Sequence, residues 1–276
     1  MRRPVQILTP AVGVVAVALL AGCAPADDGA SAPTSPSAQA SPSSPSAADA
    51  PSVTASDPPA DAVTTGAQAD DVRLEVRAGD GAVVAEPEPG SSTVTLDLAQ
   101  LSPDQDATVT LVSSGELLLR PDGSVTVRSG QDDGGTDDAP ADAVAGLTPP
   151  DGARFRQEDP RSLVVVPDES SDGRTTGTVT FTLASRGVEA TDWDEREGGR
   201  SLAVTPTPWA RQARTAGVDV VWSELVADDP EVASATMHDQ LVCHSIGAPD
   251  KATWNLEPWR PDVGLLQVLA DRCNPV

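Results

Sequence analysis

The sequence predicts an α+β fold that is mostly β: an antiparallel β-rich region, then a small disulfide-closed C-terminal domain with one or two short helices. Three observations lead to this prediction. Apolar and polar residues alternate in several short segments between residues 71 and 186, which is typical of half-buried strands. All five tryptophans and both histidines follow within residues 187–276. Two of the three cysteines, Cys243 and Cys273, lie in that same C-terminal segment.

The N-terminal segment has the features of a secretory signal peptide. It opens with Met1-Arg2-Arg3, continues with an apolar stretch over residues 5–20 and ends in the small residues Ala21 and Gly22. A basic start, a short apolar core and a small-residue cleavage site distinguish such a signal from a membrane span, which needs about 20 apolar residues. We therefore expect residues 1–22 to be removed on export.

A cysteine directly follows this segment. The sequence Leu20-Ala21-Gly22-Cys23 resembles the lipobox of bacterial lipoproteins. The resemblance implies that Cys23 becomes the lipidated first residue of the mature chain and anchors it at the extracytoplasmic face of the cell membrane. An ordinary secretory signal followed by a chance cysteine is the alternative.

Residues 23–70 are predicted to form a disordered tether. After Cys23 they are mostly Ala, Ser, Pro, Thr and Asp, without an aromatic residue. Such a segment cannot bury enough apolar area to offset the entropy that is lost on folding. We expect it to hold the folded part of the protein away from the membrane.

The charge of the chain restricts its partners. The sequence contains 42 acidic residues against 18 Lys and Arg, which gives a formal net charge of −24 at pH 7. Phosphate backbones and anionic lipid headgroups repel such a protein. Nucleic acid is therefore excluded as a partner, and contact with the membrane is expected to come from the lipid on Cys23.

Residues 71–186 are predicted to form a β-rich domain. A hairpin is expected where Leu117-Leu118-Leu119 and residues 124–128 flank Pro121-Asp122-Gly123, because these three residues favour a turn. Phe155 and Phe181 are the only aromatic residues of the region, which predicts a lean core that depends on the segment after it. The segments that alternate in polarity are residues 72–77, 93–98, 108–111, 124–128 and 178–183.

The C-terminal domain, residues 187–276, is predicted to begin with a hairpin. Its strands are residues 188–193 and 201–205, and Gly198-Gly199 between them suits a turn.

Short helices are expected after this hairpin. Pro208 in a first helical turn predicts a helix over residues 208–214 that is ended by Gly217. Residues 218–226 fit either a strand or a helix. A further helix is expected from Pro230 towards Gln240.

Two cysteines remain once Cys23 is lipidated. An isolated pair in an exported protein usually closes a disulfide, so we expect a bond between Cys243 and Cys273. Two free thiols are the alternative.

The last 39 residues contain the most specific sequence of the chain: Gln240-Leu241-Val242-Cys243-His244, then Trp254-Asn255-Leu256-Glu257-Pro258-Trp259-Arg260-Pro261, and a closing Cys273-Asn274-Pro275. Together with residues 199–207, these segments resemble an exported actinobacterial family, domain of unknown function 2599. The resemblance covers roughly residues 188–276. It implies an α+β or β-rich exported domain and no particular activity.

The segment around Trp254 and Trp259 is a candidate ligand-binding site. Two exposed rings flanked by Asn255, Glu257 and Arg260 would suit a sugar, because ring faces stack on pyranoses and polar groups bind hydroxyls. The alternative is that both rings pack around the disulfide while Glu257 and Arg260 form a supporting ion pair. We favour this alternative, because tryptophan is usually buried.

The sequence predicts neither a metal nor a cofactor. His238 and His244 are six residues apart, which places them on different faces of a helix, and no zinc-motif spacing is present. The acidic segment over residues 132–138 lacks the ligand spacing and the Glu of a calcium loop.

These observations favour a non-enzymatic binding or interaction module whose partner is a cell-wall glycan or another envelope protein. The alternative is a hydrolase of cell-wall carbohydrate, in which Glu257 acts with Asp262 or Asp239. A hydrolase requires a cleft that holds two carboxylates, one of them buried with a raised pKa.

Overall fold

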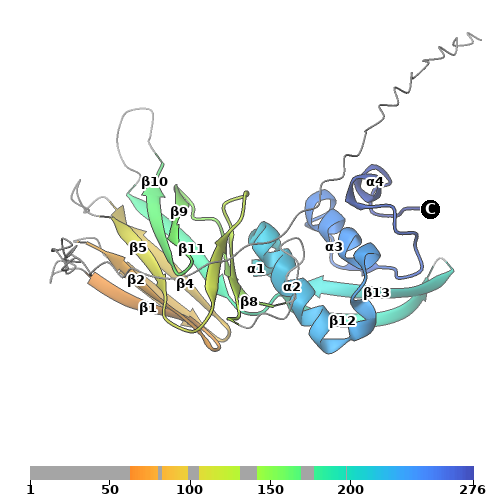
Figure 1. Ribbon diagram of the computed structural model, residues 1–276, viewed down its shortest axis with the longest axis horizontal. Helices are drawn as coiled ribbons and strands as arrows, with labels where there is room; N and C mark the ends of the chain where they lie inside the picture. Colours follow the sequence, from red (N-terminus) through yellow and green to blue (C-terminus); the bar gives the residue numbers. More distant parts are fainter. Residues whose placement is uncertain (1–62, 80–82, 99–105, 131–141, 169–176, 197) are drawn as a thin grey trace, which may run out of the picture. The chain divides into compact units, whose positions relative to one another are not determined.

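The computed structural model describes residues 63–79, 83–98, 106–130, 142–168, 177–196 and 198–276 (Figure 1). These residues all fall within one compact unit, residues 55–276. The predicted signal peptide, Cys23, most of the tether and the acidic segment over residues 132–138 lie outside the described residues. None of the described helices is both long and apolar enough to cross a membrane.

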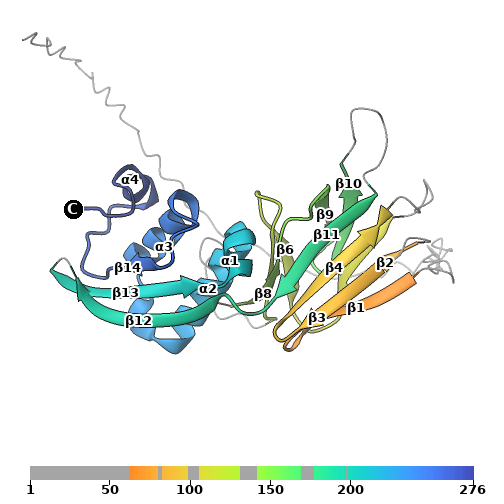
Figure 2. The same ribbon diagram turned by 180° about the vertical axis from the view of Figure 1, so that it is seen from behind.

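The β-rich region consists of two antiparallel sheets that face each other across a shared core (Figures 1 and 2). The first sheet has the order β1 (Val63–Ala69), β2 (Val72–Ala78), β5 (Ala107–Leu111), β10 (Ser162–Pro167), β9 (Ala153–Asp159). The second has the order β3 (Val83–Glu88), β4 (Ser91–Asp97), β11 (Thr178–Ala184), β8 (Ala143–Leu147), β7 (Val125–Arg128), β6 (Glu116–Leu119).

Alternating side chains of these strands fill the core between the sheets. In β4, for example, Val94 and Leu96 are fully buried while their neighbours are half-buried, as expected for a strand with one face on a core. Phe155 and Phe181 meet edge to face with their ring centroids 5.3 Å apart. The predicted strands and the hairpin of β6 and β7 are confirmed.

Strand β1 lies within the segment that was predicted to be tether. Its seven residues pair with the whole of β2, and Ala67 and Ala69 are buried in the core. Composition did not reveal this strand, because its stability comes from backbone pairing and small buried side chains rather than from large apolar residues.

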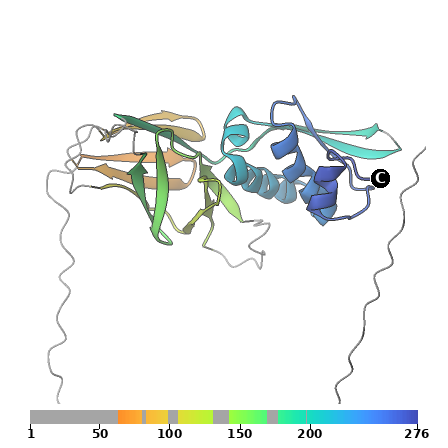
Figure 3. The ribbon, with the colours of Figure 1, turned by 90° about the horizontal axis from the view of Figure 1, so that it is seen from above.

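The C-terminal region is a small α+β domain. Its antiparallel sheet is formed by β12 (Val188–Arg196), β13 (Gly199–Pro206) and β14 (Trp254–Leu256). Figure 3 shows the helices, in blue, on one side of this sheet. They are α1 (Pro208–Gln212), α2 (Arg214–Asp228), the 3₁₀ turn η2 (Pro230–Val232), α3 (Ala235–Gly247) and α4 (Leu265–Ala270).

The predicted hairpin and disulfide are confirmed, and the helical content is higher than expected. Strands β12 and β13 pair along their length, with Val188 opposite Pro206 at one end and Arg196 opposite Gly199 at the other. Cys243 is bonded to Cys273. The segment over residues 218–226 is helical. Gly217 lies inside α2 instead of ending a helix, because α1 and α2 approach closely there: a Cβ on Gly217 would lie 2.0 Å from the Ala210 carbonyl oxygen.

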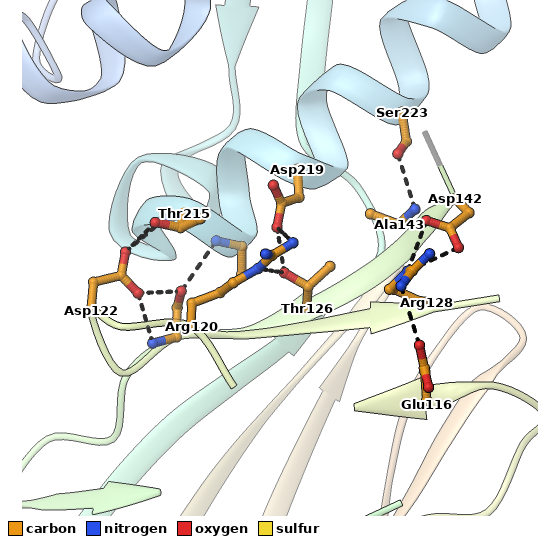
Figure 4. A network of polar contacts seen from close by, with 12 residues as sticks. Glu116, Arg120, Asp122, Thr126, Arg128, Asp142, Ala143, Thr215, Asp219 and Ser223 are labelled. Carbon is orange, nitrogen blue, oxygen red and sulfur yellow. Dashed lines mark hydrogen bonds and ion pairs between the residues drawn. The ribbon is translucent and has the colours of Figure 1, made fainter. Parts of the chain in front are cut away.

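Helix α2 connects the two regions, because it contacts β7 and β8 of the second sheet. The sheet side supplies the N-terminal cap of the helix (Figure 4). The Asp122 carboxylate accepts hydrogen bonds from the Thr215 N–H at 2.9 Å and its hydroxyl at 2.6 Å. The Ser124 hydroxyl accepts from the Ala216 N–H at 3.1 Å. These contacts satisfy amide groups that have no partner within a helix.

Candidate functional site

The residues of the predicted tryptophan site are not brought together on one surface. Trp254 lies on β14, is 1% exposed and belongs to the core of the C-terminal domain. Its indole N–H donates to the Ala248 carbonyl at 3.2 Å. The ring is therefore closed to a ligand.

Glu257 and Arg260 form a buried ion pair. The Arg260 Nε–H donates to the Glu257 carboxylate, and its Nη1 donates to the Pro275 carbonyl at 3.0 Å. The Glu257 backbone N–H donates to the Gln240 side-chain oxygen at 2.9 Å. This network ties the C-terminal segment to β14 and α3. Glu257 and Arg260 therefore form the supporting ion pair that was predicted as the alternative to a ligand-binding role.

Trp259 is 42% exposed, and part of its ring is used within the domain. The pyrrole edge lies against Gly199, where an added Cβ would be 2.2 Å from Trp259 Cδ1. The Arg260 guanidinium lies 4.5 Å from the ring centroid. Asn255 is half-buried, and its carbonyl contacts His244 Nε2 at 2.9 Å. Of the two tryptophan rings considered for a sugar site, only that of Trp259 is partly exposed.

The two histidines lie on different faces of α3. His238 packs edge to face against Trp222, with ring centroids 4.8 Å apart. His244 is buried, and among the described residues its Nδ1 has no hydrogen-bond partner. Burial lowers the pKa of His244 below its ordinary value. No group of three or more His, Cys, Asp or Glu side chains in the described ranges is placed to hold a metal ion.

A cavity of about 600 Å³ lies between the helices of the C-terminal domain and the turn that follows β6. One wall is the face of α3 that carries Asp239, Val242 and Ile246, which recur at helical spacing. The first half of α2 also lines the cavity, with Val218 and Asp219. The remaining lining residues are Asp122, Ala210, Arg211, Arg214, Thr215, His238, Ser245 and Leu265.

Asp219 is the buried carboxylate of this cavity, and it is already paired (Figure 4). Arg120 Nη2 lies 2.6 Å from its Oδ2, and the Thr126 hydroxyl donates to the same oxygen at 2.5 Å. The Arg120 Nε–H in turn donates to the Thr126 oxygen at 3.0 Å. Burial raises the pKa of Asp219 despite the arginine beside it.

Asp239 is the second carboxylate of the cavity, and it is half-buried. Its side chain forms neither a hydrogen bond nor an ion pair within the part of the chain that the structure describes. Burial and the negative charge of Asp262 both raise the pKa of Asp239. An acid in a cavity with such an environment is a candidate functional group.

The arginines of the cavity donate to backbone carbonyls. Arg211 donates to the carbonyls of Pro249, Lys251 and Ala252, and Arg214 donates to the Asp122 carbonyl at 3.0 Å. Arg211 thereby fixes the segment between α3 and β14, while Arg214 joins α2 to the turn after β6.

Sequence reasoning named Asp239 as an acid that could act with Glu257, and it missed Asp219 and Val242. Glu257 is bound by Arg260 and does not line the cavity. One signal was available for Asp219, because it is the only charged residue between Thr215 and Ser223. For Val242, the helical spacing from Asp239 to Ile246 is visible once α3 is known to extend to Gly247.

Comparison with known proteins places a family match on this domain. Residues 188–276 match a family described as a protein of unknown function, DUF2599. An uncharacterized protein of Mycobacterium tuberculosis (strain H37Rv) is 40% identical over 96 residues, which are 32% of this chain and 65% of that protein. An uncharacterized protein of Mycobacterium leprae is 36% identical over 70 residues, 24% of this chain and 57% of its own length.

The match therefore spans less than two thirds of these relatives and between about a quarter and a third of this chain. No solved structure matches the chain.

Proposed function

We propose that this chain, whose C-terminal domain matches the DUF2599 family, is a lipid-anchored protein of the cell envelope that binds a small ligand in the cavity lined by α1, α2 and α3. The cavity is the observation that carries the binding function. Its volume of about 600 Å³ is in the range of small-molecule sites, about 300–1,000 Å³. Its wall combines apolar side chains with a few polar groups, as such sites do.

The anchoring part of this proposal is supported by the N-terminal sequence. Leu20-Ala21-Gly22-Cys23 follows a basic start and an apolar stretch, and the residues after it have the composition of a tether. Metabolic labelling with an alkyne-tagged palmitate tests it. The wild-type chain is expected to carry the label and to fractionate with membranes, whereas Cys23→Ser is expected to lose both properties. An unlabelled wild-type chain contradicts the anchor.

The binding part can be tested by closing the cavity. Val242 is half-buried on the cavity face of α3 and packs against the core of the domain, so Val242→Trp is expected to fill the space, and circular dichroism checks that the variant is folded. Leu266→Trp is the matched control, because Leu266 is 85% exposed and does not line the cavity. Two-dimensional NMR spectra of the three proteins would be recorded with small cationic, neutral and anionic fragments and with soluble cell-wall glycan fragments.

Shifts centred on Val218, Val242 and Ile246 that disappear in Val242→Trp but persist in Leu266→Trp support the proposal. Shifts centred instead on Trp259, abolished by Trp259→Ala, would show that the exposed ring binds glycan and would overturn the cavity as the site. Fragment binding that is unchanged in Val242→Trp would also overturn the cavity as the site.

A hydrolase of cell-wall carbohydrate is the second candidate, and one observation favours it. The cavity is lined by two carboxylates with raised pKa values, Asp219 and Asp239. Asp219 is held by Arg120, so Asp239 would be the acid that transfers a proton. Release of reducing sugars from purified cell wall by the wild type, and its loss in Asp239→Asn, would support this function. Absence of turnover by the wild type excludes it for that substrate.

A further inference from the structure

One face of α3 combines an acid with an apolar surface. Asp239, Val242 and Ile246 all line the cavity, and Ile246 is 64% exposed. Leu265 at the start of α4 and Val218 of α2 add further apolar area. A ligand that fills this space gains by covering apolar side chains, at roughly 25 cal/mol per Å² removed from water.

Every acid that lines the cavity except Asp239 has a bonded partner among the described residues. Asp219 is paired with Arg120 and Thr126. Asp122 caps the first turn of α2. Burial alone would raise the pKa of Asp122, but four hydrogen bonds from Ser124 and Thr215 hold it below the ordinary value. Asp239 has no such partner among the described residues, and the negative charge of Asp262 acts on it.

The basic groups that line the cavity have partners within the protein. Arg211 donates to three backbone carbonyls, and Arg214 donates to the Asp122 carbonyl. An anionic ligand would have to compete with backbone carbonyls for the Arg211 guanidinium. A cation would meet the Asp239 carboxylate, which has no competing donor among the described residues.

The field of the whole chain acts in the same direction. The formal net charge is −24, and a negatively charged protein attracts cations towards its surface. Asp239 and Asp262 repel each other, and a bound cation would relieve this repulsion.

We propose that the cavity binds an organic cation with an apolar body, whose ammonium group pairs with Asp239 while its hydrocarbon part covers Val218, Val242 and Ile246. This assignment rests on the proposed binding function and adds the chemical class of the ligand. Because the ion pair forms within the cavity, it is expected to be screened less by salt than a pair on the open surface.

Three six-carbon probes separate charge from size: hexylammonium, hexanol and hexanoate. Isothermal titration calorimetry at neutral pH would measure their binding to the purified wild-type protein, to Asp239→Asn and to Asp250→Asn. Asp250 is exposed and does not line the cavity, so its variant matches the change in charge without changing the site.

Hexylammonium is expected to bind at least about tenfold more tightly than hexanoate or hexanol, and Asp239→Asn to weaken it about tenfold, the usual effect of losing a charged hydrogen-bond partner. Asp250→Asn is expected to bind as the wild type does. If hexanol or hexanoate binds as tightly, or if Asp239→Asn has no effect, the cation assignment is overturned while the binding function stands. If none of the three probes binds, the cation assignment is overturned, and the fragment titrations of wild type and Val242→Trp decide the binding function separately.

Discussion

Asp219 and Arg120 form an ion pair where α2 lies on the second sheet, and both side chains are nearly inaccessible to water. Removing one partner of a buried pair leaves an uncompensated charge, which costs about 3–5 kcal/mol. Asp219→Asn keeps the size of the side chain and removes its charge, so we expect it to lower the free energy of unfolding by an amount in this range. Urea denaturation followed by circular dichroism measures the change.

Glu75 and Arg77 provide the control for this prediction. Their side chains are also 2.6 Å apart, but both are more than a third exposed. Exposed pairs contribute about 1 kcal/mol or less, so Glu75→Gln is expected to have a small effect. Equal losses in the two variants would mean that burial does not govern the Asp219 contact.

His244 makes the stability depend on pH. Burial holds its pKa below the ordinary value of 6.5, so the unfolded chain takes up a proton at a higher pH than the folded chain does. The contribution of the neutral folded histidine is complete above pH 6.5 and is lost as the pH falls below it. Because His244→Gln lacks this titration, the stability difference between wild type and variant is expected to shrink from about pH 7.5 to about pH 5.5. A constant difference would contradict the buried neutral state.

At the scale of elements, the crossing of α1 and α2 depends on Gly217. Alanine normally favours a helix over glycine by up to about 1 kcal/mol, but a Cβ at this position would meet the Ala210 carbonyl at 2.0 Å. Gly217→Ala is therefore expected to destabilise the protein by about 1–3 kcal/mol through overpacking. Gly247 ends α3, and a Cβ there would have nothing within 4 Å, so Gly247→Ala is expected to be neutral or stabilising. Thermal unfolding of the two variants tests this contrast.

The elements that the sequence predicted best are those whose signal is local. The alternation in residues 93–98 and the turn residues Asp122-Gly123 specified a strand and a hairpin without reference to the rest of the chain. Gly217 was predicted to end a helix. In the structure a glycine is needed there because α1 lies too close for a side chain, and sequence spacing does not show that contact. Strand β1 was missed because it is stabilised by backbone pairing with β2, which leaves no apolar pattern in its own sequence.

The candidate site was predictable only in part, because a cavity is a property of several elements together. Asp239 was named from the sequence, but its partner was expected to be Glu257, which the structure places with Arg260. Neither the apolar face of α3 nor the position of Asp219 follows from residue spacing, because the lengths of α2 and α3 were not known.

At the scale of the whole unit, the β-sandwich and the C-terminal domain are expected to unfold together. The sandwich supplies Asp122 and Ser124 to the first turn of α2, and the Trp209 indole donates to the Thr182 carbonyl of β11 at 3.2 Å. Since every tryptophan lies in the C-terminal domain, tryptophan fluorescence reports on that domain and, through Trp209, on its contact with the sandwich.

A change in the sandwich core tests this cooperativity. Phe181 is buried between the sheets, and Phe181→Leu is expected to cost about 1–2 kcal/mol. The denaturation midpoint reported by tryptophan fluorescence is expected to fall as far as the midpoint reported by circular dichroism. An unchanged fluorescence midpoint would show that the two regions unfold independently.

The disulfide has a consequence for the cavity. Helix α4, which carries Leu265 into the cavity wall, lies inside the loop that Cys243 and Cys273 close, and the Cys243–Cys273 cluster packs against Val268 and Leu269 of the same helix. A chain with both thiols reduced would lack the covalent bond that holds this wall in place. If the cavity is a binding site as proposed, reducing the Cys243–Cys273 bond is expected to weaken ligand binding, because the wall that carries Leu265 is then held by packing alone.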